Sequence, residues 1–413
     1  MNIKSLLFGS AAALVAVSGA RAADAVVVAE PEPVEYVRVC DTYGAGFFYI
    51  PGTETCLSIS GYVWYQVGAN GYENDFQEVG TDVNGDPIIR DVSNDTPGYI
   101  GGRTGDGWIK STRARVNIES RSETEWGTLR GMIRLQADWG SVTRATSTSL
   151  AGNPFNDGPV GIDQGWLALG GFMAGYSESA WAASFRGGAT NFGSHSWGGM
   201  YYGYAQRHQM SYTFFGGNGF FGTLSLEDDA LAGDGYVPDV VAKVGVNQGW
   251  GSVWARFGWE DDISGLPNDF PLPGNAEHDS GWGASLAAQI NVPNSPGSSL
   301  RIFGFYANSD TRFSSGSALG TAPEWSILAS YNQQFTENFG VSVAGQYFSN
   351  LYDPGSSEKM VQEDGSNVNA WGAELSAVWT PVTNFEVRPE LHYDKVDGLD
   401  GTVSGFLRFT RYF

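Results

Sequence analysis

The stretch STRARVNIESRS (Ser111–Ser122) shows the pattern that decides the fold of this 413-residue chain. Every second position carries a polar or charged residue, namely Arg113, Arg115, Asn117, Glu119 and Arg121. The positions between them are mostly apolar, with Ala114, Val116 and Ile118. A β-strand places alternate side chains on opposite faces. The stretch therefore predicts a strand with one apolar and one charged face. The pattern alone does not say which of these two faces is in contact with bulk water.

The N-terminus has the layout of a secretory signal peptide. A lysine in MNIK precedes the mainly apolar run Leu6–Val17, and Ala20-Arg21-Ala22 forms an A-x-A cleavage site. The apolar run is shorter than the roughly 20 residues that a membrane-spanning helix requires. We therefore expect residues 1–22 to be removed, the mature chain to begin at Ala23, and the protein to be exported.

The composition suits many strands and tight turns. The 57 glycines among 413 residues are about 14% of the chain, against a usual share of about 7%. Aromatic residues make up 14%, yet the mean hydropathy is only −0.21. Beyond the signal peptide there is no apolar run of helix-spanning length. If the chain lies in a membrane, it is expected to cross with strands rather than helices.

Charge and cysteine content limit the partners and the compartment. Without Lys4 and Arg21, 45 acidic residues face 21 basic ones, a formal charge of −24. Nucleic acid is excluded as a partner because phosphate binding needs basic surface. The chain has two cysteines, Cys40 and Cys56. An oxidising compartment favours a disulfide between them, with two free thiols as the alternative.

After an irregular periplasmic lead-in at 23–56, the chain is predicted to form a transmembrane β-barrel over 57–413. Sixteen segments of about ten residues alternate in polarity, which is the pattern of such barrels. They are 57–67, 108–120, 127–139, 161–170, 172–179, 207–215, 219–228, 239–248, 251–260, 281–292, 299–309, 324–335, 338–348, 370–380, 385–395 and 403–413. Short and long links alternate between them, as expected for short periplasmic turns and long extracellular loops.

The strand faces indicate that the apolar side meets lipid. In AWGAELSAVWT one face consists of Trp371, Ala373, Leu375, Ala377 and Trp379. Eight residues of a tilted strand cover about 20 Å, close to the apolar band of about 25 Å of outer-membrane barrels. A tryptophan at each end suits the two interfaces. The charged face must then line a wet interior, so the strand at 111–122 is predicted to be inside out relative to a soluble sandwich.

The chain resembles the alphaproteobacterial porins, the general porins of rhizobia and Brucella. The resemblance rests on VEYVRVCDTYGAGFFYIPGTETCLSISGYVWY (Val34–Tyr65), YTFFGGNGF, GYVPDVVAKVGVNQGWGS and the closing FLRFTRYF. It implies a trimeric, sixteen-stranded, passive outer-membrane channel for ions and small hydrophilic solutes, with an inward-folded third loop. The terminal Phe413 resembles the signal that the outer-membrane assembly machinery reads. No enzyme activity, cofactor or metal is implied.

The pore constriction is expected between an arginine wall and the third loop. The wall residues are Arg113, Arg115, Arg130 and Arg134 on adjacent strands. The third loop, Ser179–Gln206, supplies Arg186 and His195, with Glu178 at its base. Low-dielectric walls focus such charges into the lumen. This local basic excess predicts a pore that favours cations less than the net charge of the chain suggests and that leans toward anions. Alternatively, some of the arginines pair with Glu119, Asp138 or loop acids and brace the wall.

Other motifs give weaker evidence for a function. DVNGD (Asp82–Asp86) lacks the closing glutamate of a calcium loop, GNGFFG (Gly217–Gly222) opens a strand rather than a dinucleotide-binding helix, and the four histidines lack zinc spacing. The acidic loops are either a solvated face or sites for divalent cations that bridge to lipopolysaccharide. Three rivals stay open: a sugar-selective channel using Tyr201, Tyr202 and Tyr204, an outer-membrane lipid hydrolase, and a soluble secreted β-sandwich or adhesin.

Overall fold

The structure is a computed structural model. It describes residues 38–71, 76–81, 87–91, 109–141, 155–157, 160–184, 192–198, 200–228, 237–263, 279–362 and 364–413. The expected signal peptide at 1–22, the DVNGD motif and Arg186 lie outside these residues.

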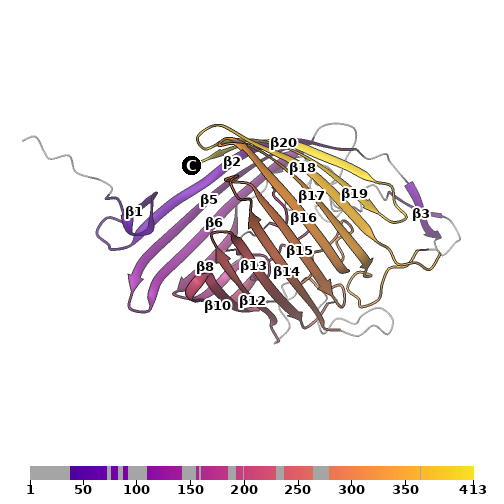
Figure 1. Cartoon of the computed structure of the whole chain (residues 1–413), viewed down its shortest axis with the longest axis horizontal. Helices are drawn as coiled ribbons and strands as arrows, with labels where there is room; N and C mark the ends of the chain where they lie inside the picture. The colour runs from indigo at the N-terminus through magenta and orange to yellow at the C-terminus, as the bar shows by residue number, and fades with distance from the viewer. Residues whose placement is uncertain are drawn as a thin grey trace, which may run out of the picture.

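Across the described ranges, sixteen antiparallel strands form the wall of a closed barrel (Figure 1). They are β2 (Cys56–Gly71), β5 (Ile109–Thr124), β6 (Gly127–Ser141), β8 (Gly161–Leu169), β9 (Phe172–Glu178), β10 (Gln206–Phe215), β11 (Phe220–Glu227), β12 (Asp239–Gln248), β13 (Gly251–Glu260), β14 (Gly281–Asn291), β15 (Ser299–Ala307), β16 (Pro323–Thr336), β17 (Phe339–Leu351), β18 (Ala370–Val382), β19 (Phe385–Val396) and β20 (Thr402–Tyr412). Each pairs with its neighbours in chain order, and β20 pairs with β2 to close the wall. The predicted sixteen-stranded barrel is confirmed.

The connections alternate strictly between the two ends of the barrel, as the sequence pattern predicted. Short links at 125–126, 170–171, 216–219, 249–250, 292–298, 337–338 and 383–384 alternate with connections at 72–108, 142–160, 179–205, 228–238, 261–280, 308–322, 352–369 and 397–401. In an antiparallel wall successive links lie at opposite ends. All the links of the first set therefore share one end, and those of the second set share the other.

Among the elements of the described residues, four short strands and two 3₁₀ turns were not predicted. They are β1 (Phe47–Tyr49), β3 (Phe76–Thr81), β4 (Pro87–Asp91), β7 (Phe155–Asp157), η1 (Asp41–Tyr43) and η4 (Gly217–Gly219). The expectation of an irregular lead-in was thus incomplete, because β1 pairs with the start of β2. This pairing covers the edge of β2 beyond the end of β20. No helix in the described part of the chain has the length and apolar character needed to cross a membrane.

The predicted disulfide is present and ties the lead-in to the barrel. Cys40 and Cys56 are bonded, with their Cα atoms 6.0 Å apart. Both cysteines are buried in a small cluster with Phe47, and Tyr43 and Tyr49 pack against it. Cys56 is the first residue of β2, so the bridge joins the segment before the barrel to its first wall strand.

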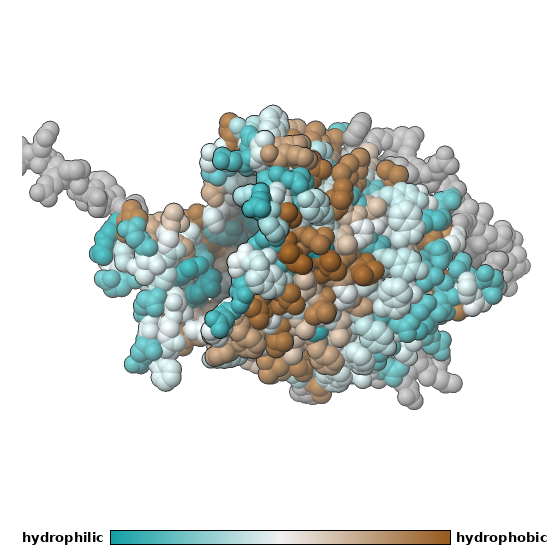
Figure 2. Space-filling view, viewed as in Figure 1, coloured by the Kyte–Doolittle hydropathy of each residue, from teal (hydrophilic) through white to brown (hydrophobic). Residues whose placement is uncertain are grey.

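The outer face is apolar and the inner face polar. On β18, Trp371, Leu375 and Trp379 are 45%, 46% and 48% exposed, while Glu374 and Ser376 between them are buried. Figure 2 shows apolar side chains gathered over the middle of the wall, with polar side chains toward the ends. This arrangement fits a lipid-facing band around a polar interior. On β5 Ala114 points outward, as the inside-out reading predicted.

The barrel interior also holds an apolar cluster. It combines Ala180, Trp181, Ala182, Met200 and Tyr202, all between β9 and β10, with side chains of β11 to β16 such as Phe221, Trp254, Phe303 and Leu328. The connection between β9 and β10 is therefore packed against the inner side of one half of the wall. Strands β2, β5, β6 and β8 contribute no side chain to this cluster.

Candidate pore constriction

Four predicted wall arginines lie together on the inner face of two paired strands. Arg113 and Arg115 belong to β5, and Arg130 and Arg134 to β6. The side chains on this face point into the lumen because their neighbours on each strand point outward. The sequence prediction that these residues share one wall is consistent with this register.

Carboxylates are interleaved among these arginines. The ion pairs are Arg113–Asp138 at 2.6 Å, Arg130–Glu119 at 2.6 Å, Arg121–Glu119 at 2.9 Å, Arg134–Asp163 at 3.1 Å, Arg115–Asp163 at 3.4 Å and Arg134–Glu178 at 3.6 Å. The wall is thus a mixed lattice of both signs rather than a purely basic face. Partly buried pairs of this kind hold side chains in place, and their opposite charges reduce the net field.

Aromatic side chains of the neighbouring strands β2 and β8 pack against these arginines on the inner face of the wall. The guanidinium of Arg115 lies 5.3 Å from the ring centroid of Tyr62, and that of Arg113 lies 5.5 Å from that of Trp64. On the other side, Arg130 lies 5.1 Å from the ring of Trp166. Such contacts favour a cation over the ring face and restrict its rotamers. The arginine heads are therefore held at set positions along the lumen.

Exposure distinguishes Arg130 from the rest. Its side chain is 36% exposed, against 25% for Arg113, 17% for Arg115 and 15% for Arg134. A charge that keeps more contact with water is more available to a passing ion. Arg130 is accordingly the most water-accessible of the four predicted wall arginines.

The stem of the β9–β10 connection is held by buried polar groups of the wall. The backbone N–H of Ala180 donates to Glu227 Oε1 at 2.8 Å, and Lys243 Nζ donates to the carbonyl oxygen of Ala183 at 2.6 Å. Arg256 donates to the carbonyl oxygen of Trp181 and lies 4.5 Å from its ring centroid. Glu178 is the last residue of β9, at the base of this connection as expected.

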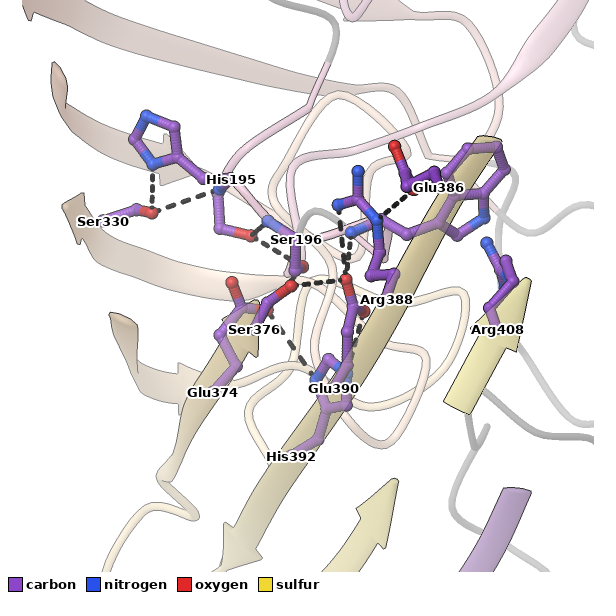
Figure 3. A network of polar contacts seen from close by, with 12 residues as sticks. His195, Ser196, Ser330, Glu374, Ser376, Glu386, Arg388, Glu390, His392 and Arg408 are labelled. Atoms are coloured by element: carbon purple, nitrogen blue, oxygen red, sulfur yellow. Dashed lines mark hydrogen bonds and ion pairs between the residues drawn. The ribbon is translucent and has the colours of Figure 1, made fainter. Parts of the chain in front are cut away.

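His195 and Ser196, in the tip of the connection (residues 192–198), lie beside Ser330 of β16 and Glu374 of β18 (Figure 3). His195 Nδ1 is 2.7 Å from Ser330 Oγ, and its Nε2 is 2.8 Å from Ser299 Oγ. Burial, with a smaller effect of Arg301, lowers the pKa of His195 to about 3. The predicted basic contribution of His195 is therefore absent at neutral pH, and the neutral ring instead anchors the tip to β15 and β16.

Two glutamates hold the next residues of the tip. Ser196 Oγ donates to Glu374 Oε2 at 2.7 Å, and the backbone N–H of Trp197 donates to Glu390 Oε1 at 2.6 Å. The ring of Trp197 lies 4.4 Å from the guanidinium of Arg408 on β20. Figure 3 shows these side chains converging from β18, β19 and β20 on one turn of chain.

Trp197 brings the tip next to the arginine wall. Its ring makes an edge contact with Tyr62 of β2, at 5.9 Å between centroids, and Tyr62 carries Arg115 on its face. The described residues of the β9–β10 connection therefore contact strands from β11 to β19 and, through Trp197, the first wall strand β2.

The sequence analysis did not select several of these residues as candidates for the site. They are Asp163, Trp197, Glu374, Glu390 and Arg408. A usable signal was the inward series Glu386, Arg388, Glu390 and His392 on the predicted strand 385–395, which places ionisable groups at four successive inward positions. The residues that these side chains contact lie far away in the sequence. The contacts could therefore not be predicted without knowing how the strands are aligned with one another.

The three tyrosines do not form a ladder along the lumen. Tyr202 is 7% exposed within the interior cluster, whereas Tyr204 is 48% exposed. The backbone of Tyr201 exchanges hydrogen bonds with Gln346 at 3.1 and 2.8 Å. In the described part of the chain, no group of histidine, cysteine and acidic residues has the geometry of a metal site.

A closed barrel with an apolar exterior, a charged interior and a segment docked across its lumen defines a transmembrane β-barrel channel. The chain belongs to the porin family, because residues 24–405 match the family described as Porin subfamily. The porin Omp2b of Brucella suis is 32% identical over 436 aligned residues, with both chains covered completely. Family and fold place the protein in the outer membrane of a Gram-negative bacterium, as a passive-diffusion channel and not an enzyme.

Solved structures share the fold at low identity. The outer-membrane channel DcaP of Acinetobacter baumannii has a TM-score of 0.58 and 15% identity, with 88% of this chain and 99% of that chain covered. The trimer form of OmpT of Vibrio cholerae has a TM-score of 0.50 and 10% identity, with 87% and 100% covered. Both likenesses show the barrel architecture alone.

Proposed function

We propose that ions and small hydrophilic solutes diffuse through a constriction bounded by the β9–β10 connection and by the arginine wall of β5 and β6. The observation that carries this proposal is the docking of residues 192–198 on β15 to β20, which leaves the β5–β6–β8 face as the opposite boundary. Passage is then set by the size of the gap and by its field, without a binding cycle or an energy source.

The charge balance of the wall supports weak ion selectivity. Its basic side chains are Arg113, Arg115, Arg121, Arg130 and Arg134, and its acidic ones are Glu119, Asp138, Asp163 and Glu178, which is five against four. The pore is thus far less cation-favouring than the formal charge of the mature chain implies. The small remaining preference for anions resides in Arg130, the most exposed member.

Reversal potentials across a planar bilayer in a KCl gradient test this proposal. Wild type should be weakly selective, Arg130→Gln should shift toward K⁺, and the charge-preserving Arg130→Lys should stay near wild type. Strong cation selectivity of the wild type, or no shift in Arg130→Gln, would overturn it.

We also infer that the channel is a homotrimer that contacts neighbouring copies through the outer face of β2, β5 and β6. The supporting residues are mainly aliphatic or small, such as Ile59, Val63, Ala114 and Ile133, and give a smooth surface. A trimer form is named for Vibrio cholerae OmpT. A heat-dissociable trimer on a semi-native gel is expected, and Ala114→Arg should convert it to a monomer that still conducts.

The two ends of the barrel are proposed to face different compartments. The short links are proposed to face the periplasm together with the lead-in at 23–56, after removal of residues 1–22. The long connections would face outward and meet lipopolysaccharide. Phe413 would present the C-terminal signal to the assembly machinery, with its backbone already paired to Gly61 of β2 at 2.9 and 3.0 Å.

A sugar-selective channel is the second possibility that a described residue favours, because the ring of Tyr204 is exposed and could stack on a sugar. Liposome swelling with neutral sugars of graded size separates the two cases. A smooth fall of rate with size supports general diffusion, whereas one sugar far above that line supports selectivity.

A further inference from the structure

The indole of Trp197 meets the seam of the barrel, where β20 pairs with β2. The guanidinium of Arg408 on β20 lies 4.4 Å from the centroid of the Trp197 ring, and the ring of Tyr62 on β2 lies 5.9 Å from it. Elsewhere the tip is held by hydrogen bonds with residues of four other strands, namely Ser299 of β15, Ser330 of β16, Glu374 of β18 and Glu390 of β19. In the described contacts, the tip therefore meets the seam through one side chain.

Three aromatic rings surround the guanidinium of Arg408. Their centroids lie at 4.4 Å for Trp197, 4.6 Å for Trp64 and 4.7 Å for Phe406. Arg408 also donates from Nε to Gln66 Oε1 at 2.8 Å, and from Nη2 to the same oxygen. As a result only 5% of Arg408 is exposed. Trp64 and Phe406 belong to the wall strands β2 and β20, so Trp197 is the ring that covers Arg408 from the side of the tip.

The charge of Arg408 is covered and only partly compensated. Glu390 acts on it as a counter-charge at longer range, whereas Arg388 and Arg113 oppose its positive charge. Within the described ranges no carboxylate lies at ion-pair distance from Arg408, and its Nη1 has no hydrogen-bond partner there. A buried guanidinium of this kind gains from contact with water. Uncovering it would add one positive charge to the field inside the barrel.

The indole can be removed without releasing the rest of the tip. Alanine at position 197 keeps the backbone N–H that Glu390 accepts at 2.6 Å, and it leaves the hydrogen bonds of His195 and Ser196 in place. The space that the indole fills would then open between the tip and the seam. Trp197 itself is half-buried and so already in contact with solvent. The opened space would therefore be continuous with the water of the lumen.

We infer that Trp197 determines both the size limit and the charge preference of the channel, because its indole closes the space between the tip and the β20–β2 seam and covers Arg408. The inference rests on the proposed diffusion function and deepens it. With the indole in place, solutes pass the constriction at the arginine wall and do not meet the guanidinium of Arg408. Without it, a second gap lined by Arg408 joins the pore, and this gap favours anions.

Planar-bilayer conductance in KCl and liposome swelling with neutral sugars of graded size test the size limit. Trp197→Ala should conduct more than wild type and admit sugars that wild type excludes, and Trp197→Phe, which keeps a ring, should lie between the two. Trp371→Ala is the matched control, because it removes a 45% exposed indole from the outer face of β18. This control should behave as wild type. Equal conductance and equal size limits in Trp197→Ala and wild type would overturn the inference.

Reversal potentials in a KCl gradient test whether the indole covers Arg408. Trp197→Ala should shift the reversal potential toward Cl⁻. The double variant Trp197→Ala/Arg408→Met should lose this shift and keep the larger size limit, because methionine fills space among the rings without a charge. Arg408→Met should therefore change the reversal potential less in wild type than in Trp197→Ala. A tip that is merely loosened would give the same shift with and without Arg408, and that result would overturn the inference.

Two further comparisons keep the outcome unambiguous. Heat-modifiable mobility reports whether Trp197→Ala has folded; if it has not, Trp197→Leu takes its place, with both shifts expected in the same direction and smaller. The constriction proposal fails if wild type is strongly cation-selective or if Arg130→Gln leaves the reversal potential unchanged. Failure of the inference on Trp197 appears instead in the size limit of the Trp197 variants and in the dependence of their Cl⁻ shift on Arg408.

Discussion

The backbone N–H of Trp197 donates a hydrogen bond to Glu390 Oε1 at 2.6 Å, although the two residues are 193 positions apart in the chain. The same oxygen accepts Ser376 Oγ at 2.9 Å and lies 3.6 Å from Arg388 Nη1. A buried carboxylate with two hydrogen-bond donors and a guanidinium nearby is well stabilised, and it fixes the turn that approaches the first wall strand. Glu390 is therefore a latch for the tip of the β9–β10 connection.

Replacing Glu390 by alanine should release this latch. The N–H of Trp197 would lose its acceptor, and a hydrogen bond to a charged group is worth about 1.5–3 kcal/mol. Frequent transitions to subconductance levels are expected in single-channel traces. Glu390→Gln keeps an acceptor oxygen and should behave much closer to wild type; equally quiet traces in both variants would show that Glu390 does not hold the tip.

Acidification should weaken the attachment of the tip through His195. The docked ring has a pKa of about 3 because burial disfavours its charged form, whereas a released histidine titrates near 6.5. The released state binds the proton more readily, so attachment is fully stable above about pH 6.5 and loses stability as pH falls toward 3. Arg301 adds to the effect by repelling the charged ring.

Channel fluctuations recorded from pH 7 to pH 3 measure this dependence. Wild type should become noisier across that interval. His195→Gln can bond a serine hydroxyl but does not titrate, so it should show a flatter profile. Glu374 and Glu390 also face the tip and titrate in both proteins, so only the difference between the profiles reports His195. Identical profiles would contradict the prediction.

Alternating polarity predicted the wall because lipid and water act on successive side chains of each strand. The bounds of β12 and β13 agree with the predicted segments 239–248 and 251–260. The short strands β1 and β7 escaped notice since three residues are too few to show a period. They form by pairing with an existing edge, β2 or β6, which only the folded barrel provides.

The candidate pore constriction was predictable only in part, because its contacts depend on how neighbouring strands are aligned. That Arg113 and Arg134 point inward follows from alternation within one strand. That Asp163 reaches both Arg115 and Arg134 depends on how β8 is aligned with β6, where the register shifts beside Arg134. The mixed charge of the wall could therefore not be read from the arginines alone.

Removing the disulfide should loosen the lead-in and spare the barrel. Cys40 and Cys56 close a loop with a sequence separation of 16, and such a crosslink contributes about 3 kcal/mol by restricting the unfolded chain. The wall strands pair without residues 38–55. Limited proteolysis of Cys40→Ser/Cys56→Ser should cut within residues 38–55 faster than in wild type, while heat-modifiable mobility persists. Loss of the folded barrel would show that the bridge is needed for the wall.

Gly61 should be indispensable for closing the barrel. It exchanges backbone hydrogen bonds with Phe413 at 2.9 and 3.0 Å, at the seam where the last residue meets the first wall strand. An added Cβ would overlap the carbonyl oxygen of Arg115 and lie 2.9 Å from Cζ of Phe413. Overpacking of this kind costs about 1–3 kcal/mol or more, so Gly61→Val should lower the folded fraction in urea-titrated refolding. Gly304→Ala is the matched control, because nothing lies within 4 Å of its Cβ position on β15. The seam argument requires Gly61→Val to unfold at clearly lower urea than Gly304→Ala, and equal midpoints would refute it.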